Sequence, residues 1–134
     1  MKILLVDSSK MVREKLRRYL ELENQFDQIF ETDLVVEAKM IISKVKVDVI
    51  LFDIQLTGNS GLELVPMSKS IIPKPVLILF TNYKLPQYLN IYKQMSIDYC
   101  FDKSSGLAEL KSFIKKLVLE LKNPTQENYY HQSN

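Results

Sequence analysis

Short apolar runs alternate five times with longer amphipathic stretches along this sequence. The apolar runs have the length of β-strands, whereas the stretches between them carry apolar residues at the spacing of one helix face. Parallel strands need a crossover between them, and a helix is the usual crossover. The alternation therefore predicts an α/β fold, a doubly wound five-stranded parallel sheet flanked by helices. The expected strands are 2–6, 27–32, 47–53, 74–81 and 97–101, and the expected helices are 8–23, 33–45, 60–70, 85–94 and 107–121.

Several local signals refine these elements. Residues 47–53, with the sequence VDVILFD, are apolar on both faces, which is typical of a central strand in a parallel sheet. Ser8 or Ser9 is expected to cap the first helix, and Asp33 is expected to open the second. Pro66 predicts that the third helix is short or kinked.

Length and charge limit the possible functions. The 134 residues fit one compact domain over 1–121 with a flexible tail at 122–134. A balance of 18 Lys and Arg against 16 Asp and Glu gives a net charge of +2 without a dense basic block, so direct nucleic-acid binding is not expected. No apolar stretch approaches the length of a secretory leader or a membrane span, which predicts a cytoplasmic protein with no membrane partner.

The chain offers few reactive groups. Cys100 is the single cysteine, which excludes an internal disulfide, and His131 is the single histidine, which excludes histidine metal cages and Ser-His-Asp chemistry. Any chemistry must therefore come from carboxylates, hydroxyls and lysines.

Four polar side chains follow the predicted strands at the points where those strands end. Asp7 follows the first strand, Asp53 ends the third, Thr81 ends the fourth and Lys103 lies just past the fifth. In doubly wound sheets the carboxyl ends of the strands border the functional crevice. We therefore expect two acids, a hydroxyl and an ammonium to converge on one small pocket.

These groups favour capture of a phosphoryl group. A carboxylate oxygen of Asp53 can attack phosphorus if a divalent cation screens the charge between the attacking and phosphoryl oxygens. Mg²⁺ retains several waters, so Asp7, Asp53 and the backbone carbonyl of Gln55 would suffice as protein ligands. Lys103 can neutralise one phosphoryl oxygen, and Thr81 can donate a hydrogen bond to another.

Four segments carry a resemblance to a known family. They are LLVDSS at 4–9, ILFDIQLTGNSGLEL at 50–64, ILFTNY at 78–83 and YCFDKSSG at 99–106. In this order and approximate spacing, the chain resembles the receiver domain of two-component response regulators over about residues 1–121. The resemblance implies a flavodoxin-like topology.

The resemblance also implies a function and a role for single residues. The phosphoryl group would come from a sensor histidine kinase or a histidine phosphotransfer protein, and the output would be altered binding to an unknown downstream protein. Such a stand-alone receiver is a signalling switch rather than an enzyme, beyond its own phosphorylation and dephosphorylation. The implied roles are Asp53 as phosphoacceptor, Thr81 as switch hydroxyl, Lys103 as the site lysine, Asp7 as a metal-site acid and Gly61 as the loop glycine that provides the tight turn into the third helix.

Three positions depart from the pattern of the family. Ser8 stands where a second acid is usual, and a hydroxyl is a poorer ligand for a hard cation, so Mg²⁺ is expected to bind weakly. Cys100, between Tyr99 and Phe101, stands where an aromatic switch residue is common. Thr57 stands where many receivers have proline, which leaves the backbone of that loop less constrained.

Other functions stay open beside this one. Ser8 and Cys100 favour a pseudo-receiver that binds partners without phosphorylation. A small phosphatase is disfavoured because Gln55, and not an acid, lies two residues after Asp53. A flavin-binding protein is disfavoured because the segment DSSKMVRE is charged and bulky where a phosphate loop would lie. Helix packing and a partner-binding face stay equal interpretations of Tyr83, Tyr88 and Tyr92.

Ser8→Asp should tighten Mg²⁺ binding and speed phosphorylation at low Mg²⁺, because the new carboxylate adds an oxygen ligand and a negative charge beside the cation. Titration of both proteins with Mg²⁺ measures the change. Equal or weaker affinity in the variant would show that the hydroxyl is not what limits metal binding.

Overall fold

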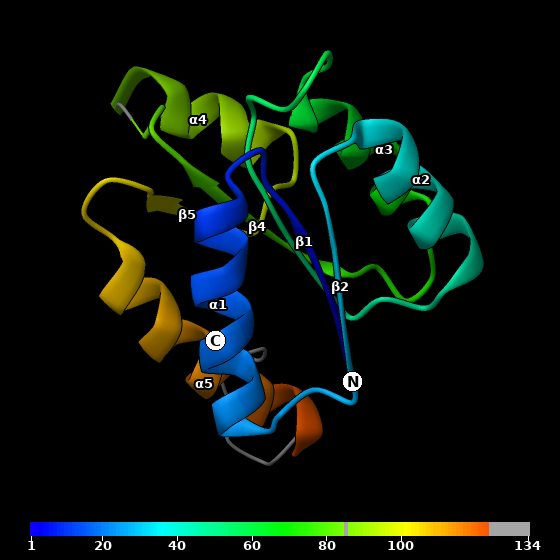
Figure 1. The fold of residues 1–134 in the computed structure, drawn as a ribbon. Coiled ribbons are helices and arrows are strands. Elements are labelled where there is room, and N and C mark those ends of the chain that lie inside the picture. The colour runs from blue at the N-terminus through cyan, green and yellow to red at the C-terminus, as the bar shows by residue number, and fades with distance from the viewer. Residues whose placement is uncertain (85, 124–134) are drawn as a thin grey trace, which may run out of the picture.

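The computed structural model describes residues 1–84 and 86–123, which fold around one five-stranded parallel sheet (Figure 1). Its strand order is β2-β1-β3-β4-β5, with β3 in the centre. The predicted doubly wound sheet is thereby confirmed, and β3 is buried along its whole length, as its apolar sequence requires. The strands are β1 Lys2–Val6, β2 Gln28–Thr32, β3 Val49–Phe52, β4 Val76–Thr81 and β5 Tyr99–Asp102.

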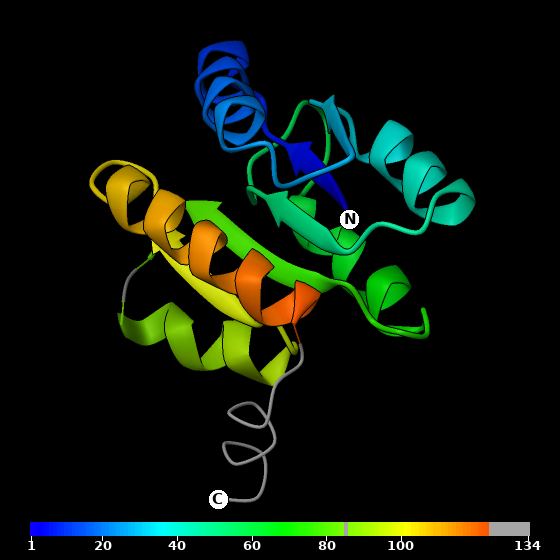
Figure 2. The same ribbon diagram turned by 90° about the horizontal axis from the view of Figure 1, so that it is seen from below.

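Helices cover both faces of the sheet (Figure 2). On one face, α1 and α5 pack through residues such as Leu16 and Ile114, and on the other face, α2, α3 and α4 pack through residues such as Ile42 and Val65. The two layers of apolar side chains form the core. The helices are α1 Lys10–Glu23, α2 Val35–Lys44, α3 Leu64–Lys69, α4 Pro86–Gln94 and α5 Leu107–Lys122, and a 3₁₀ turn, η1 Gly61–Glu63, precedes α3.

The first residues of α1 and α2 can be compared with the predicted helix caps. Ser9 caps α1, because its Oγ accepts the Val12 N–H at 3.2 Å. The prediction that Asp33 opens α2 is wrong, since the helix begins at Val35 with Leu34 at the cap. Here the Oγ1 of Thr32, one residue earlier, accepts the Leu34 N–H at 3.1 Å and supplies the local turn.

The third helix is short, as its proline predicted. Pro66 lies in the first turn of α3, where a missing N–H leaves no helical bond unmade. At the other end of the chain, α5 continues to Lys122, one residue beyond the predicted domain limit. The predicted tail lies outside the described residues from 124 onward, and so does Leu85, the expected start of the fourth helix.

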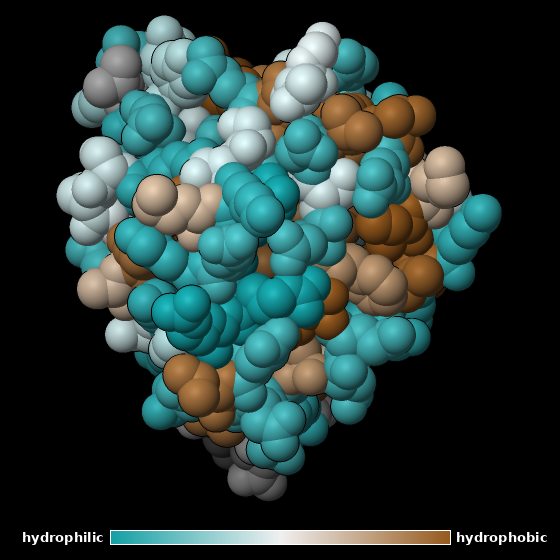
Figure 3. All heavy atoms as spheres, viewed as in Figure 1, coloured by the Kyte–Doolittle hydropathy of each residue, from teal (hydrophilic) through white to brown (hydrophobic). Residues whose placement is uncertain are grey.

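The surface is mixed in polarity. Figure 3 shows mostly hydrophilic side chains over α1 and a gathering of apolar ones over α2 and α3, where Val36 and Met40 are exposed. None of the helices in residues 1–84 and 86–123 is long and apolar enough to cross a membrane.

Gly61 allows the backbone just before α3 to contact the backbone that follows β3. Its N–H donates to the Ile54 carbonyl at 2.7 Å, and a Cβ added at Gly61 would lie 1.8 Å from the carbonyl oxygen of Asp53. Glycine is therefore required here for close approach and not for a left-handed turn. By contrast, Gly58 has a φ of +81° and open space around the position of its missing Cβ.

Gly61→Ala should lower the free energy of unfolding by about 3 kcal/mol, because backbone must move to admit the methyl group. Gly58→Ala, the matched control, should cost about 1 kcal/mol for its left-handed φ and leave the amide signals near Asp53 in place. Denaturant unfolding and amide spectra measure both effects. A Gly61→Ala protein as stable as the control would show that this contact is easily relieved.

Candidate functional site

Two acids lie side by side where the central strands end. Asp7 directly follows β1 and Asp53 directly follows β3, and these strands are paired neighbours in the sheet. The Asp7 N–H donates to the Thr32 carbonyl and the Asp53 N–H donates to the Val6 carbonyl, each at 3.1 Å. Both residues are only 5% exposed. Carboxylates this buried are stable only with partners nearby.

Lys103 supplies that partner. It follows β5, and its N–H donates to the Thr81 carbonyl at 2.9 Å. Its side chain reaches past the end of β4 and places Nζ 2.7 Å from Asp7 Oδ2 and 2.7 Å from Asp53 Oδ2. The structure thus brings together three of the predicted residues, from three different strand ends. We call this group the acid–lysine cluster.

Charge and hydrogen bonding fix the protonation of the lysine. Burial alone would lower the pKa of Lys103, but hydrogen bonds from its ammonium to Asp53 and Asp7 outweigh burial, so the pKa is raised above its ordinary value. The ammonium of Lys103 is therefore charged at neutral pH. A phosphoryl group would meet a cation already in place.

Backbone donors orient the two carboxylates. The Ser9 N–H donates to Asp7 Oδ1 at 2.8 Å, and the Ile54 N–H donates to Asp53 Oδ1 at 2.7 Å. Each carboxylate is thus held from one side by the loop that follows it and from the other side by Lys103. Little rotational freedom is left to either acid.

The remaining predicted residues border the cluster. Thr81 is fully buried at the end of β4, and its Oγ1 accepts the Tyr83 N–H at 3.2 Å. Gln55 is exposed in the loop after β3, where its backbone forms an isolated bridge with Ser60. Neither residue has a contact with Asp7 or Asp53 of the kind that Lys103 makes. Their roles stay predictions.

The donors present fit a hydrated Mg²⁺ ion only modestly. No group of three or more His, Cys, Asp or Glu that could hold a metal occurs among residues 1–84 and 86–123. Asp7 and Asp53 contribute two carboxylates, which is enough for an ion that keeps several waters. Ser8 is exposed and brings no carboxylate. The Lys103 ammonium also holds oxygens of both acids, so a cation would share them.

Cys100 and the tyrosines near α4 lie on the opposite side of the sheet from α1. Cys100 is half-buried against the core that contacts α4, and burial raises the pKa of its thiol, so it packs as a small apolar residue. Tyr92 is buried, and its Oη donates to the Tyr83 carbonyl at 2.9 Å. Tyr83 and Tyr88 are partly exposed and line a groove of about 390 Å³. Tyr92 is thus part of the helix packing, whereas Tyr83 and Tyr88 are available at the surface.

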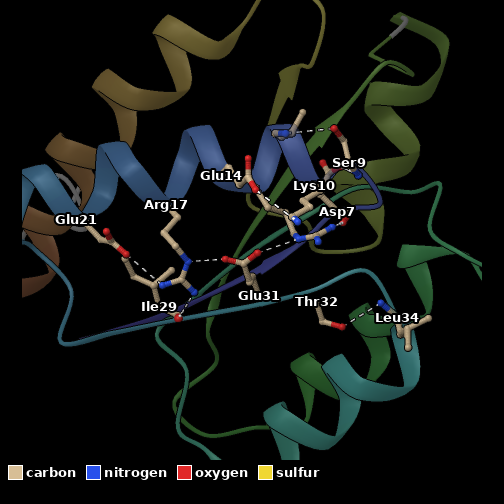
Figure 4. Close-up of polar contacts among 12 residues, drawn as sticks. Asp7, Ser9, Lys10, Glu14, Arg17, Glu21, Ile29, Glu31, Thr32 and Leu34 are labelled. Atoms are coloured by element: carbon tan, nitrogen blue, oxygen red, sulfur yellow. Dashed lines mark hydrogen bonds and ion pairs between the residues drawn. The ribbon is translucent and has the colours of Figure 1, made fainter.

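Sequence reasoning missed one pair of residues beside the cluster. Arg13, in the second turn of α1, donates from Nη1 to the Asp7 carbonyl at 2.6 Å and from Nε to Glu31 at 3.1 Å. Figure 4 shows the side chain of Glu31, on β2, in contact with Arg17 of α1. Glu31, a charged residue inside a short strand, was the available signal in the sequence, but its position does not indicate which arginine it pairs with.

The comparison with known families decides what kind of domain this is. A family model described as the response regulator receiver domain matches residues 3–115. The chain belongs to the response regulator receiver family. Receiver domains are signalling switches of two-component systems, and Mg²⁺ binding and aspartate phosphorylation are typical of them.

Curated relatives agree with this assignment. The chain is 36% identical over 122 residues to the transcriptional regulatory protein BtsR of Escherichia coli, and 30% identical over 120 residues to the sensory transduction protein LytT of Bacillus anthracis. These matches cover 89% and 87% of this receiver but 48% of each relative. The chain spans about half the length of the curated relatives it matches. That the receiver stands alone stays a prediction.

Solved structures share the fold. A receiver domain of a putative Luxo repressor protein from Vibrio parahaemolyticus superimposes with a TM-score of 0.78 at 18% identity, covering 90% of this chain and 92% of that one. The receiver domain of a DNA-binding response regulator from Colwellia psychrerythraea gives 0.75 at 24% identity, covering 88% and 98%. The flavodoxin-like receiver topology is therefore confirmed.

Lys103→Met should lower the free energy of unfolding at neutral pH by about 3 kcal/mol, because it leaves two buried carboxylates facing each other without a cation. A raised pKa means that the pairing stabilises the fold below the ordinary lysine pKa of 10.5 and that this contribution is lost as pH rises through the folded pKa. The difference between wild type and variant should therefore begin to shrink above pH 10.5.

Denaturant unfolding at pH 8 and at pH 11 measures this difference. Lys116→Met, at an exposed position of α5, is the control for loss of a lysine as such and should change little at either pH. A Lys103→Met protein as stable as that control would mean that the carboxylates do not need the ammonium.

Proposed function

We propose that this receiver accepts a phosphoryl group on Asp53 from a sensor histidine kinase or a histidine phosphotransfer protein and thereby changes its binding to a downstream protein. The observation that carries the proposal is the contact between the Lys103 ammonium and Asp53 Oδ2 at 2.7 Å, in a buried acid pair at the carboxyl edge of the sheet. Buried charge of this kind at a strand end is costly for the fold alone, which favours a functional reason for it.

The transfer would form one bond and break one. An oxygen of Asp53 attacks phosphorus as the bond from phosphorus to the donor imidazole nitrogen breaks, and that nitrogen keeps the electron pair and is protonated. Lys103 stays protonated and donates to a phosphoryl oxygen. Asp7 and Asp53 would hold Mg²⁺, with the Gln55 carbonyl as a third ligand, and the ion would screen charge between the reacting oxygens.

Thr81 would connect the phosphoryl group to the surface. Its Oγ1 accepts the Tyr83 N–H, and the Tyr83 carbonyl accepts the Tyr92 hydroxyl of α4. A Thr81 hydroxyl that turns to donate to a phosphoryl oxygen would disturb the first of these bonds. The change would reach α4 through Tyr83 and Tyr92, in a domain where Cys100 replaces the expected aromatic residue. Phosphorylation would then shift a two-state equilibrium of this face.

The limits of this function follow from the same residues. The domain would catalyse no reaction beyond its own phosphorylation and dephosphorylation, because Gln55 has no proton to give or take as a carboxylic acid would. The name of BtsR refers to transcriptional regulation, but the low net charge of this chain disfavours direct nucleic-acid contact by the receiver itself. The cytoplasmic location and the lack of a membrane partner stay predictions.

A pseudo-receiver is the second candidate function. Two observations favour it. Ser8, which is exposed, stands where the family usually has a second acid, and residues 1–84 and 86–123 contain no group of three or more His, Cys, Asp or Glu that could hold a metal. A domain that binds its partner without phosphate would keep the fold and the α4 surface but would show no response to a phosphodonor.

Asp53→Asn should abolish labelling by acetyl phosphate in the presence of Mg²⁺, because the amide oxygen is a poor nucleophile. Intact-mass spectrometry measures the label, and its removal by hydroxylamine identifies an acyl phosphate. Asp33→Asn is the matched control, since Asp33 follows β2 at the same edge of the sheet but outside the acid–lysine cluster.

Asp33→Asn should be labelled like the wild type. Labelled Asp53→Asn would place the acceptor elsewhere, and an unlabelled wild type that still binds its partner would favour the pseudo-receiver.

A further inference from the structure

Arg13 holds the backbone of the loop that presents Asp7. Its side chain is 14% exposed, and its Nη1 donates to the Asp7 carbonyl at 2.6 Å. On the other side of the same residue, the Asp7 N–H donates to Thr32 of β2. The Asp7 residue is thus bound through its N–H, its carbonyl and its carboxylate.

Glu31 holds Arg13 in turn. It lies on β2 beside Leu5 of β1, and its two carboxylate oxygens accept from Nε of Arg13 and Nε of Arg17. Burial alone would raise the pKa of Glu31, but the hydrogen bonds from Arg17 and Arg13 outweigh burial and lower the pKa. Glu31 is therefore ionised at neutral pH and keeps the guanidinium of Arg13 fixed.

The two arginines differ in what they reach beyond Glu31. Arg17 donates from Nη2 to the Ile29 carbonyl and from Nη1 to Glu21, and Figure 4 shows these partners on the side of Glu31 that faces away from Asp7. Arg13 uses its fork to join Glu31 and the Asp7 carbonyl at once. A lysine in its place has one nitrogen and cannot reproduce that pair of bonds.

We propose that Arg13 is a positioning residue for Asp7, fixing the loop from Asp7 to Ser9 so that the Asp7 carboxylate keeps the orientation needed to hold a divalent cation. The Ser9 N–H donates to Asp7 Oδ1, so rotation of the peptide after Asp7 would move that donor away from the carboxylate. Because Ser8 brings no carboxylate, Asp7 is the one acid that this loop offers. The part of the proposal that concerns the cation rests on the proposed function.

A purely structural role makes a different prediction. If Arg13 merely fastens α1 to β2 through Glu31, then loss of Arg13 and loss of Arg17 should have the same effects, because both contact the same carboxylate. A positioning role predicts that the conformation of the loop from Asp7 to Ser9 and the affinity for Mg²⁺ depend on Arg13 and not on Arg17. The chain thus contains its own control.

The test compares Arg13→Met, Arg13→Lys and Arg17→Met with the wild type. The first readout is amide hydrogen exchange and the chemical shift of Ser9, without metal or phosphodonor. The second is the Kd for Mg²⁺ from titration of the amide spectrum, and the third is thermal stability.

Both Arg13 variants should speed exchange of the Ser9 amide and raise the Kd for Mg²⁺ by about 10-fold, the lower end for lost outer-sphere partners of metal ligands. Arg17→Met should lose thermal stability but keep the Ser9 amide and the Mg²⁺ affinity of the wild type. Arg13→Lys retains the positive charge beside Glu31, so it keeps the comparison possible if Arg13→Met does not fold.

Unchanged Ser9 exchange in the Arg13 variants, or an equal change in Arg17→Met, would overturn the proposal. Beryllofluoride with Mg²⁺ separates this result from the phosphoacceptor proposal. A wild type that shows no response near Asp53 would count against phosphorylation, whereas the Ser9 readout needs neither metal nor phosphate and would still decide the role of Arg13.

Discussion

The contact between one ammonium and two buried carboxylates is the constraint on which the rest of this site depends. Parallel strands end at one edge of the sheet, so the acids that follow β1 and β3 meet there as like charges with little water around them. Such a pair is unfavourable unless a cation lies against it. Lys103 reaches both acids from β5, across the end of β4, and so ties four neighbouring strands together at their carboxyl ends.

The loops around this contact are built to hold it. Gly61 lets the segment before α3 approach the Asp53 backbone, and Arg13 binds the Asp7 carbonyl from α1. On the other side, Thr81, Tyr83 and Tyr92 form a chain of hydrogen bonds toward α4. One route supports the acids and the other leads from the site to an exposed groove. A receiver needs both, since the charge captured at the site has to alter a surface elsewhere.

Particular residues show how far the sequence could predict this arrangement. The five strands and the meeting of Asp7, Asp53 and Lys103 follow from alternating patterns and from the rule for strand ends, which are local signals joined by one general constraint. The start of α2 was predicted wrongly, because Thr32 and not Asp33 supplies the turn there. The Arg13–Glu31 pair was missed, because the residues are 18 positions apart and each has several charged neighbours in sequence.

By itself, the sequence determined the doubly wound sheet, its central strand and the chemical types of the side chains at its edge. These features depend on periodicity and on the order of elements, which a chain carries along its length. Only the tertiary structure decided that Lys103 bridges both acids, that Tyr92 is buried while Tyr83 and Tyr88 are partly exposed, and that Arg13 holds Asp7. These features depend on the direction of side chains between elements that are distant in sequence, and packing of the whole domain sets that direction.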